Sequence, residues 1–365
     1  MKILTIVGAR PQFIKAAMVS RIIAKHHDVV EILVHTGQHY ANTLSTIFFK
    51  ELELPAPKYF LGVGSGTHGV QTGKMLEALD PILLKEKPDV VLVYGDTNST
   101  LAGALSASKL HIPVAHVEAG LRSFNRMMPE EINRILVDHI SDYLFAPSET
   151  SVKNLMREGI PAQNIHLVGD VMYDAVLHYA QKAQSENNIL EELNLRPHTY
   201  VLATIHRAEN TDSPEILCNI WKSLVALSHE IPIVFPMHPR TRNALGAAGC
   251  AGGVLPETFK LIEPVSYLAM LSLEANSKVV ITDSGGVQKE AFFLKRPCIT
   301  LREETEWVEL VDLGWNELVS PKLSYTRLLS NIKRLVFVPP VGANIEPYGK
   351  GDSAQKIVSI LVSDQ

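Results

Sequence analysis

Short apolar runs alternate with longer segments of helical periodicity along most of the chain. The runs are rich in Val, Ile and Leu, which is typical of buried parallel strands. In the first half they occupy residues 3–7, 30–34, 90–93, 114–117, 143–145 and 165–168. In the second half they occupy residues 200–205, 231–235, 259–262, 278–282, 298–301 and 317–319. Helical segments such as 216–228 separate most of them, so the pattern predicts an α/β fold with two doubly wound parallel sheets.

The length of the chain indicates two domains. At 365 residues it exceeds what one hydrophobic core usually serves. We expect residues 1–169 to form an N-terminal Rossmann-like domain and residues 170–349 to form a C-terminal one. A last helix within 350–365 is expected to return to the first domain. The polar segment 185–197 is expected to be a surface excursion.

Polar clusters follow the predicted strands, and ligands of parallel sheets bind beyond the carboxyl ends of the strands. In the first half the clusters read GARPQFIK, GQHY, YGDTNST and EAGLRS. In the second half they read HRAEN, MHPRTR, DSGGVQKE and REETEW. If the two polar edges face each other, they form a deep cleft between the domains.

One strand leads into a glycine turn that begins a helix. Ser284, Gly285 and Gly286 leave the backbone free to approach a ligand, and the unpaired N–H groups of a helix start attract phosphate. The same turn is common as a purely structural feature of α/β proteins. The charged residues elsewhere in the chain favour the phosphate-binding interpretation.

Two cations surround the first strand-to-helix turn. Arg10 and Lys15 lie beside Pro11, which suits a first helical turn. They would bind a diphosphate, Arg10 through its planar fork and Lys15 as a point charge. The alternative is a solvated helix start.

Several carboxylates follow strands or begin helices. Asp96 is either a carboxylate in the cleft or the N-cap of the next helix. Glu118 lies between apolar strand residues and a glycine, so it needs a partner or a chemical task. Glu130 and Glu131 begin a helix, where their charge complements the helix dipole, and Arg134 lies one turn after Glu130 and can pair with it.

The histidines differ in their surroundings. His206 follows the strand at 200–205 beside Arg207, and this position favours catalysis over a structural role. His238 is a weaker candidate for a catalytic role. His116 lies inside a strand and is expected to be part of the core.

Composition and absent motifs exclude several functional classes. The net charge of −5 argues against nucleic-acid binding. No apolar run is long enough to span a membrane, and the chain starts as a strand rather than a signal peptide, so we expect a cytoplasmic protein. Cys218, Cys250 and Cys298 are widely spaced and fit no metal pattern or disulfide framework, as expected in a reducing compartment. Walker A, Gly-x-Ser-x-Gly and HExxH motifs are absent, and the residues show no cluster of metal ligands. The turn after the first strand, Gly8-Ala9-Arg10-Pro11, lacks the GxGxxG of nicotinamide enzymes. Neither a metal nor a nicotinamide cofactor is therefore expected.

Taken together, the motifs resemble those of the non-hydrolysing UDP-N-acetylglucosamine 2-epimerases. In family order they are GARPQFIK, TGQH, YGDTNST, HVEAGLRS, PEEINR, IHRAEN, MHPRT, DSGGVQKEA and EPYGKG. The resemblance implies a GT-B-like fold whose two Rossmann-like lobes face across a cleft, with UDP bound by the C-terminal lobe. It also implies a homodimer that needs no cofactor. Its reaction eliminates UDP across C1–C2 to give a glycal, and then adds UDP back with a proton on the other face of C2.

The resemblance assigns roles to particular positions. Those that match the catalytic positions of the family are Asp96, Glu118, Glu130 and His206. Those that match diphosphate, sugar and ribose contacts are Arg10, Lys15, Arg134, Ser284, Gly285, Gly286 and Glu290. Those that match part of a second, activating UDP-sugar site are Gln38, Arg207 and His238.

The chain departs from the common family pattern in three places. The usual Thr-Glu-Arg-Pro-Glu segment is TEWVE at 305–309, a Gln of the second site is Ala41, and an Arg-Arg pair becomes Arg207-Ala208. The last two departures argue against activation by substrate. The motifs look closest to the branch that acts on UDP-2,3-diacetamido-2,3-dideoxyglucuronic acid for surface polysaccharide. The alternatives are UDP-N-acetylglucosamine as substrate, or a hydrolysing relative. A carboxylated sugar calls for an extra cation, and the candidates are Arg122, Arg126 and His39.

Overall fold

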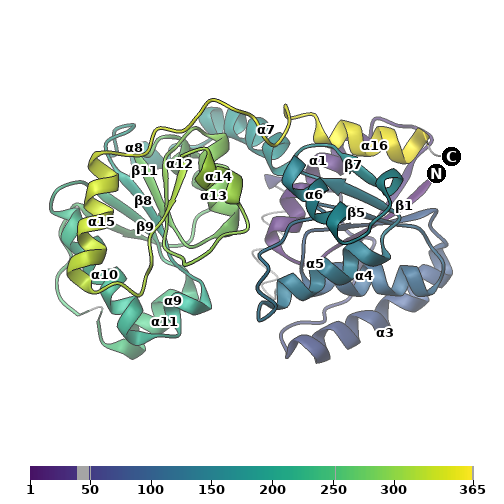
Figure 1. The fold of residues 1–365 in the computed structure, drawn as a ribbon, viewed down its shortest axis with the longest axis horizontal. Coiled ribbons are helices and arrows are strands. Elements are labelled where there is room, and N and C mark those ends of the chain that lie inside the picture. Colours follow the sequence, from purple (N-terminus) through teal and green to yellow (C-terminus); the bar gives the residue numbers. More distant parts are fainter. Residues whose placement is uncertain (39–48, 50, 251, 364–365) are drawn as a thin grey trace. The chain divides into compact units, whose positions relative to one another are not determined.

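The computed structural model describes the chain except residues 39–48, 50, 251 and 364–365. It divides into two compact units, each built around its own parallel sheet (Figure 1). Unit 1 contains Met1–Ala175 and Glu346–Gln365, and unit 2 contains Val176–Ile345. Among the described residues, no helix is long and apolar enough to cross a membrane.

Unit 1 has a seven-stranded parallel sheet in the order β3-β2-β1-β4-β5-β6-β7. Its strands are β1 (Lys2–Val7), β2 (Val30–His35), β3 (Tyr59–Phe60), β4 (Val90–Tyr94), β5 (Val114–Val117), β6 (Tyr143–Ala146) and β7 (Ile165–Leu167). The central strands are almost completely buried, which explains their continuous apolar sequences.

Helices cover the sheet of unit 1. They are α1 (Arg10–Ile23), α3 (His68–Glu86), α4 (Asn98–Lys109), α5 (Pro129–Ile140), α6 (Glu149–Arg157), α16 (Ser353–Ser363) and the first residues of α7 (Val171–Glu186). α4 packs between α3 and α5, and Gly103 lets it approach the sheet closely, since a Cβ there would lie 2.7 Å from Ile6. α16 packs against α1.

Unit 2 has a six-stranded parallel sheet in the order β10-β9-β8-β11-β12-β13. Its strands are β8 (Val201–Thr204), β9 (Ile233–Pro236), β10 (Phe259–Ile262), β11 (Val279–Thr282), β12 (Cys298–Thr300) and β13 (Asn316–Leu318). Its helices after α7 are α8 (Ile189–Glu192), α9 (Ala208–Thr211), α10 (Pro214–Ser228), α11 (Pro239–Ala248), α12 (Tyr267–Ala275), α13 (Gly285–Phe293), α14 (Val308–Asp312) and α15 (Tyr325–Phe337). The two parallel sheets confirm the predicted α/β fold class.

Three details differ from the sequence-based expectations. The two-residue strand β3 extends the first sheet and is not among the predicted strands. The segment 185–197 is not a plain surface excursion, because it contains α8 and its apolar side chains pack against a core cluster of unit 2. Cys218 and Cys250 form a disulfide with a Cα–Cα distance of 5.6 Å, contrary to the expectation of free thiols. They meet because α10 packs against α11, and sequence spacing does not show that contact.

Both sheets reverse their strand order at one point, and this point locates the expected ligand sites. In unit 1 the reversal lies between β1 and β4, and in unit 2 it lies between β8 and β11. Open parallel sheets bind ligands beyond the carboxyl ends of the strands at such switch points. The residues after these four strands are therefore the first to examine.

Candidate functional site

Lys15 and Glu118 form a buried ion pair at the switch point of unit 1. Lys15 lies on α1 and Glu118 follows β5, and their side chains are 8% and 9% exposed. The pair gives Glu118 the partner that its position required. The backbone φ of Glu118 is +74°, a left-handed conformation that costs a residue with a side chain about 1–3 kcal/mol. Two hydrogen bonds hold it there, since the N–H groups of Glu118 and Ala119 both donate to the carbonyl of Phe145 at 3.1 Å.

Asp96 and Arg134 form a second ion pair beside the first strand ends. Nε and Nη2 of Arg134 donate to one Asp96 oxygen at 3.0 and 2.6 Å. Arg134 also pairs with Glu131 at 2.8 Å, the neighbour of the glutamate expected from the sequence. Asp96 is not the N-cap of α4, because the side chain of Thr97 takes that role. The carboxylate of Asp96 is thus held by a cation and is 26% exposed.

Glu131, which the sequence analysis assigned only to the helix dipole, is a structural carboxylate. It is 1% exposed and accepts hydrogen bonds from the backbone N–H groups of Ser123 and Phe124, both at 2.9 Å. Burial alone would raise its pKa, but the bonds from Ser123 and Arg134 hold its pKa below the usual value. Glu131 therefore fixes the loop before α5. The only signal in the sequence is its place in the first turn of that helix.

The other predicted residues of unit 1 lie at the same edge of the sheet. Arg10 begins α1 and Glu130 lies in the first turn of α5, and both are partly exposed. Gln38 follows β2, and its Oε1 accepts hydrogen bonds from the backbone N–H and the hydroxyl of Ser99 at 2.9 and 2.6 Å. The first turn of α4 thus holds Gln38 in place.

The candidate cations for a carboxylated sugar, Arg122 and Arg126, differ in burial and in ion pairing. Arg122 is wrong for that role, because it is buried and bonds Glu158 at 2.6 Å and Asp138 at 2.7 Å. Arg126 is exposed and forms no ion pair within the part of the chain that the structure describes. His39 and Ala41 lie outside the described residues.

Asp283 organises the switch point of unit 2. This fully buried carboxylate follows β11 and accepts the backbone N–H groups of His206 and Arg207, at 3.1 and 3.0 Å, and the side-chain amide of Asn210 at 3.0 Å. The segment after β8 is therefore tied to the end of β11. The sequence shows Asp283 only as the first letter of a motif, so this role was missed.

The predicted histidines of unit 2 lie next to each other. The His206 and His238 rings are 5.3 Å apart between centroids, and Nδ1 of His206 is 3.5 Å from Asp283. The His206 side chain is 38% exposed, so solvent or a ligand can reach it. Arg207 follows directly and lies 3.7 Å from Glu209.

Ser284, Gly285 and Gly286 begin α13 as the sequence predicts. The Ser284 side chain does not cap this helix start, and Gly286 is exposed. A Cβ at Gly285 would lie 2.5 Å from Oε1 of Glu306, so a larger residue there would have to displace this carboxylate. Glu290 lies further along α13 and is 6% exposed. A helix start with accessible N–H groups suits an anionic ligand.

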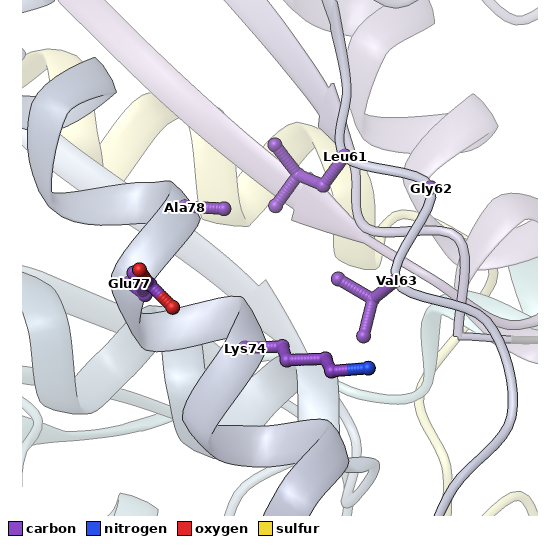
Figure 2. Close-up of a pocket in the computed structure, with 6 residues that line it drawn as sticks. All are labelled: Leu61, Gly62, Val63, Lys74, Glu77 and Ala78. Atoms are coloured by element: carbon purple, nitrogen blue, oxygen red, sulfur yellow. The ribbon is translucent and has the colours of Figure 1, made fainter.

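A surface pocket of about 430 Å³ lies elsewhere in unit 1, between α3 and the segment after β3. Figure 2 shows the residues that line it, which are Leu61, Gly62, Val63, Lys74, Glu77 and Ala78. None of the predicted site residues is among them. The switch points remain the better candidate sites, because they bring together the polar residues of several strands.

Comparison with known proteins agrees with this geometry. A family model described as UDP-N-acetylglucosamine 2-epimerase matches residues 21–362. The UDP-N-acetylglucosamine 2-epimerase homolog of Methanococcus maripaludis is 54% identical, and the UDP-2,3-diacetamido-2,3-dideoxy-D-glucuronate 2-epimerase of Pseudomonas aeruginosa is 49% identical, each over 99% of both chains. The crystal structure of Methanocaldococcus jannaschii UDP-GlcNAc 2-epimerase in complex with UDP-GlcNAc and UDP has a TM-score of 0.90 and 47% identity, and covers 100% of both chains. The chain therefore belongs to the UDP-N-acetylglucosamine 2-epimerase family and is an isomerase of the non-hydrolysing UDP-sugar 2-epimerase type.

Proposed function

We propose that this enzyme inverts C2 of a UDP-2-acetamido sugar by eliminating UDP and adding it back. In the first step a base removes the C2 proton while the bond between C1 and the diphosphate oxygen breaks, leaving a glycal and UDP. In the second step the UDP oxygen attacks C1, and a proton is delivered to the opposite face of C2. The C2–H and C1–O bonds of a gluco substrate are trans-diaxial, which suits an anti elimination. These two reaction steps require acid–base groups but no redox cofactor.

The paired charges at the switch point of unit 1 are the observation that carries the proposal. Glu118 with Lys15 and Asp96 with Arg134 place two carboxylates at the ends of neighbouring strands. Each carboxylate is held by its cation at the edge of the sheet where ligands of parallel sheets bind. We assign the acid–base chemistry to these two together with Glu130 and His206.

Unit 2 supplies the proposed binding site for UDP. The start of α13 at Ser284, Gly285 and Gly286 suits the diphosphate, and Glu290 is assigned to the ribose hydroxyls. Arg10 and Lys15 are assigned to the negative charge of the departing UDP. The M. jannaschii relative, whose structure contains UDP-GlcNAc and UDP, supports a nucleotide-sugar ligand.

We propose UDP-2,3-diacetamido-2,3-dideoxyglucuronate as the substrate, with UDP-N-acetylglucosamine as the second candidate. The P. aeruginosa relative carries the name of the first activity, and the M. jannaschii relative that of the second. Arg126 is the assigned partner of the sugar carboxylate, because it is an exposed cation on the loop that Glu131 holds. The homodimer and a second UDP-sugar site at Gln38, Arg207 and His238 are further parts of the proposal, testable by light scattering and by substrate saturation curves.

Deuterium exchange at C2 tests the reaction directly. The purified enzyme is incubated with each UDP-sugar in D₂O and followed by NMR. Deuterium at C2 with UDP still attached supports the epimerase, and accumulating free sugar and UDP indicate the hydrolysing alternative. No exchange with any UDP-sugar contradicts the proposal.

Variants assign the residues in the same assay. Glu118→Gln and His206→Ala should each slow exchange by about 100-fold or more, the usual contribution of a positioned acid or base. The control is Glu192→Gln, which removes an exposed carboxylate from α8. Arg126→Ala should raise KM for the carboxylated sugar about tenfold or more and leave UDP-N-acetylglucosamine unaffected, as expected for a lost charge-assisted contact. Equal effects on both sugars would count against the assigned substrate.

A further inference from the structure

His116 is a buried histidine whose two ring nitrogens both have polar partners. One of these partners is next to Asp96, a proposed acid–base residue of unit 1. It lies on β5 and is fully buried. Its Nδ1 is 2.7 Å from an oxygen of Asp138 on α5, and its Nε2 is 2.7 Å from the backbone carbonyl oxygen of Gly95 after β4. We propose that His116 is a positioning residue, an imidazolium paired with Asp138 that fixes the Gly95 turn beside Asp96, Lys15 and Glu118. Its effect on catalysis rests on the function proposed above.

The charge follows from counting protons. A carbonyl oxygen only accepts hydrogen bonds, so Nε2 of His116 must carry a hydrogen to bond Gly95. Nδ1 faces a carboxylate, so one proton must also lie between His116 and Asp138. If that proton is on Nδ1, the ring is an imidazolium; if it is on the carboxylate, the ring is neutral.

The surroundings of Asp138 place the proton on the ring. The other oxygen of this fully buried carboxylate is 2.7 Å from Nη1 of Arg122 and accepts the backbone N–H of Gly120 at 3.1 Å. Burial alone would raise the pKa of Asp138, but His116 and Arg122 hold it below the usual value. Arg122 in turn bonds Glu158. An ionised carboxylate between two cations is therefore the arrangement that these contacts favour.

Gly95 connects this buried network to the proposed acid–base residues. Its φ is +62°, and a Cβ there would lie 3.3 Å from both Oε1 of Glu118 and Nζ of Lys15. Its N–H donates to Val117 at 2.9 Å, and its carbonyl accepts from His116. Both polar groups of Gly95 are thus fixed, and the next residue is Asp96. A shift of this turn would move both proposed carboxylates.

The charge of His116 can be read by ¹⁵N NMR of histidine-labelled protein, with its signal assigned by loss in His116→Gln. His35 is an internal reference, because burial lowers its pKa to about 4 and its ring is neutral at pH 8. We expect the His116 ring to be doubly protonated at pH 8 and singly protonated in Asp138→Asn, where the amide can donate to Nδ1. A neutral His116 in the unmodified enzyme at pH 8 would overturn the assignment.

The positioning role is tested with Asp138→Asn, which keeps the shape of the side chain. We expect kcat for C2 exchange to fall about tenfold or more with KM unchanged, since small misplacements of reacting groups are costly. Amide exchange at residues 94–98 should become faster. His166→Gln on β7 is the matched control.

Unchanged kcat in Asp138→Asn, or a fall in kcat with unchanged amide exchange at 94–98, would overturn the positioning role. If the unmodified enzyme exchanges no C2 proton with any UDP-sugar, the proposed function fails. The NMR and amide-exchange results would still decide the charge of His116 and its hold on Gly95.

Discussion

Units 1 and 2 arrange their first six strands in equivalent order around a switch point, but they hold the residues at that point differently. In unit 1 charged side chains hold each other, as in the pairs of Lys15 with Glu118 and Arg134 with Asp96. In unit 2 a single buried carboxylate, Asp283, holds backbone N–H groups. The first arrangement presents charged side chains for proton transfer, and the second shapes a backbone site for an anion. The same topology therefore supports two kinds of chemistry.

The tryptophans allow this comparison to be tested within one chain. All three, Trp221, Trp307 and Trp315, lie in unit 2. Tryptophan fluorescence therefore reports the unfolding of unit 2, whereas circular dichroism reports the helices of both units. A change confined to one unit should separate the two signals.

Removing Asp283 should give the largest loss of stability. Asp283→Ala leaves buried donors at His206, Arg207 and Asn210 without their acceptor, so we expect a loss of about 3–5 kcal/mol seen by fluorescence. Asp96→Ala is the counterpart in unit 1, and its partly exposed ion pair should contribute about 1 kcal/mol or less to stability. Its main effect should be on C2 exchange. Similar losses of stability in both variants would contradict the comparison.

Acid should weaken unit 1 through His35, at the end of β2. Burial lowers the pKa of His35 from 6.5 to about 4. The unfolded chain therefore takes up a proton below pH 6.5 that the folded protein refuses until about pH 4, so stability falls as the pH drops through this range. The loss should reach about 3 kcal/mol. The measurement is denaturant unfolding by circular dichroism between pH 7 and pH 4. His35→Phe should remove this part of the pH dependence of the free energy of unfolding. If the pH dependence of the free energy of unfolding is unchanged in that variant, other groups cause the loss of stability in acid.

Two adjacent glycines of unit 2 provide the smallest and most local test. Gly285→Ala should destabilise unit 2 by about 1–2 kcal/mol, because the new Cβ would lie 2.5 Å from Glu306. Gly286→Ala meets only Ser284 at 3.9 Å and should stabilise α13 by about 0.5 kcal/mol. Fluorescence-monitored unfolding should shift in opposite directions for the two variants. Shifts in the same direction would mean that Glu306 does not limit this turn.

Much of the fold was predictable because buried parallel strands have a simple sequence pattern. Of the strands in the described part of the chain, the apolar runs located all but β3, whose two residues pair with β2 alone. The disulfide between Cys218 and Cys250 escaped prediction because it depends on how two helices pack.

The candidate site was predictable where a polar residue directly follows a strand, as Asp96 and Glu118 do. It was not predictable where the role depends on what lies opposite. Glu131 looks like any glutamate of a first helical turn until its bonds to Ser123 and Phe124 are seen. Asp283 likewise needs the segment after β8 before its role is visible. The pairing of Arg134 with Asp96 joins residues 38 positions apart, and helical spacing does not reveal it.

The return of the chain to unit 1 affects the order in which the protein matures during synthesis. α16 packs against α1, and the backbone N–H groups of Ser353 and Ala354 donate to Asp174. Unit 2 is one continuous stretch, so a nascent chain can finish it while unit 1 still lacks a helix on the ribosome. Unit 1 is therefore begun first but completed last. Lys15 lies on α1, the helix against which α16 packs at the end of synthesis.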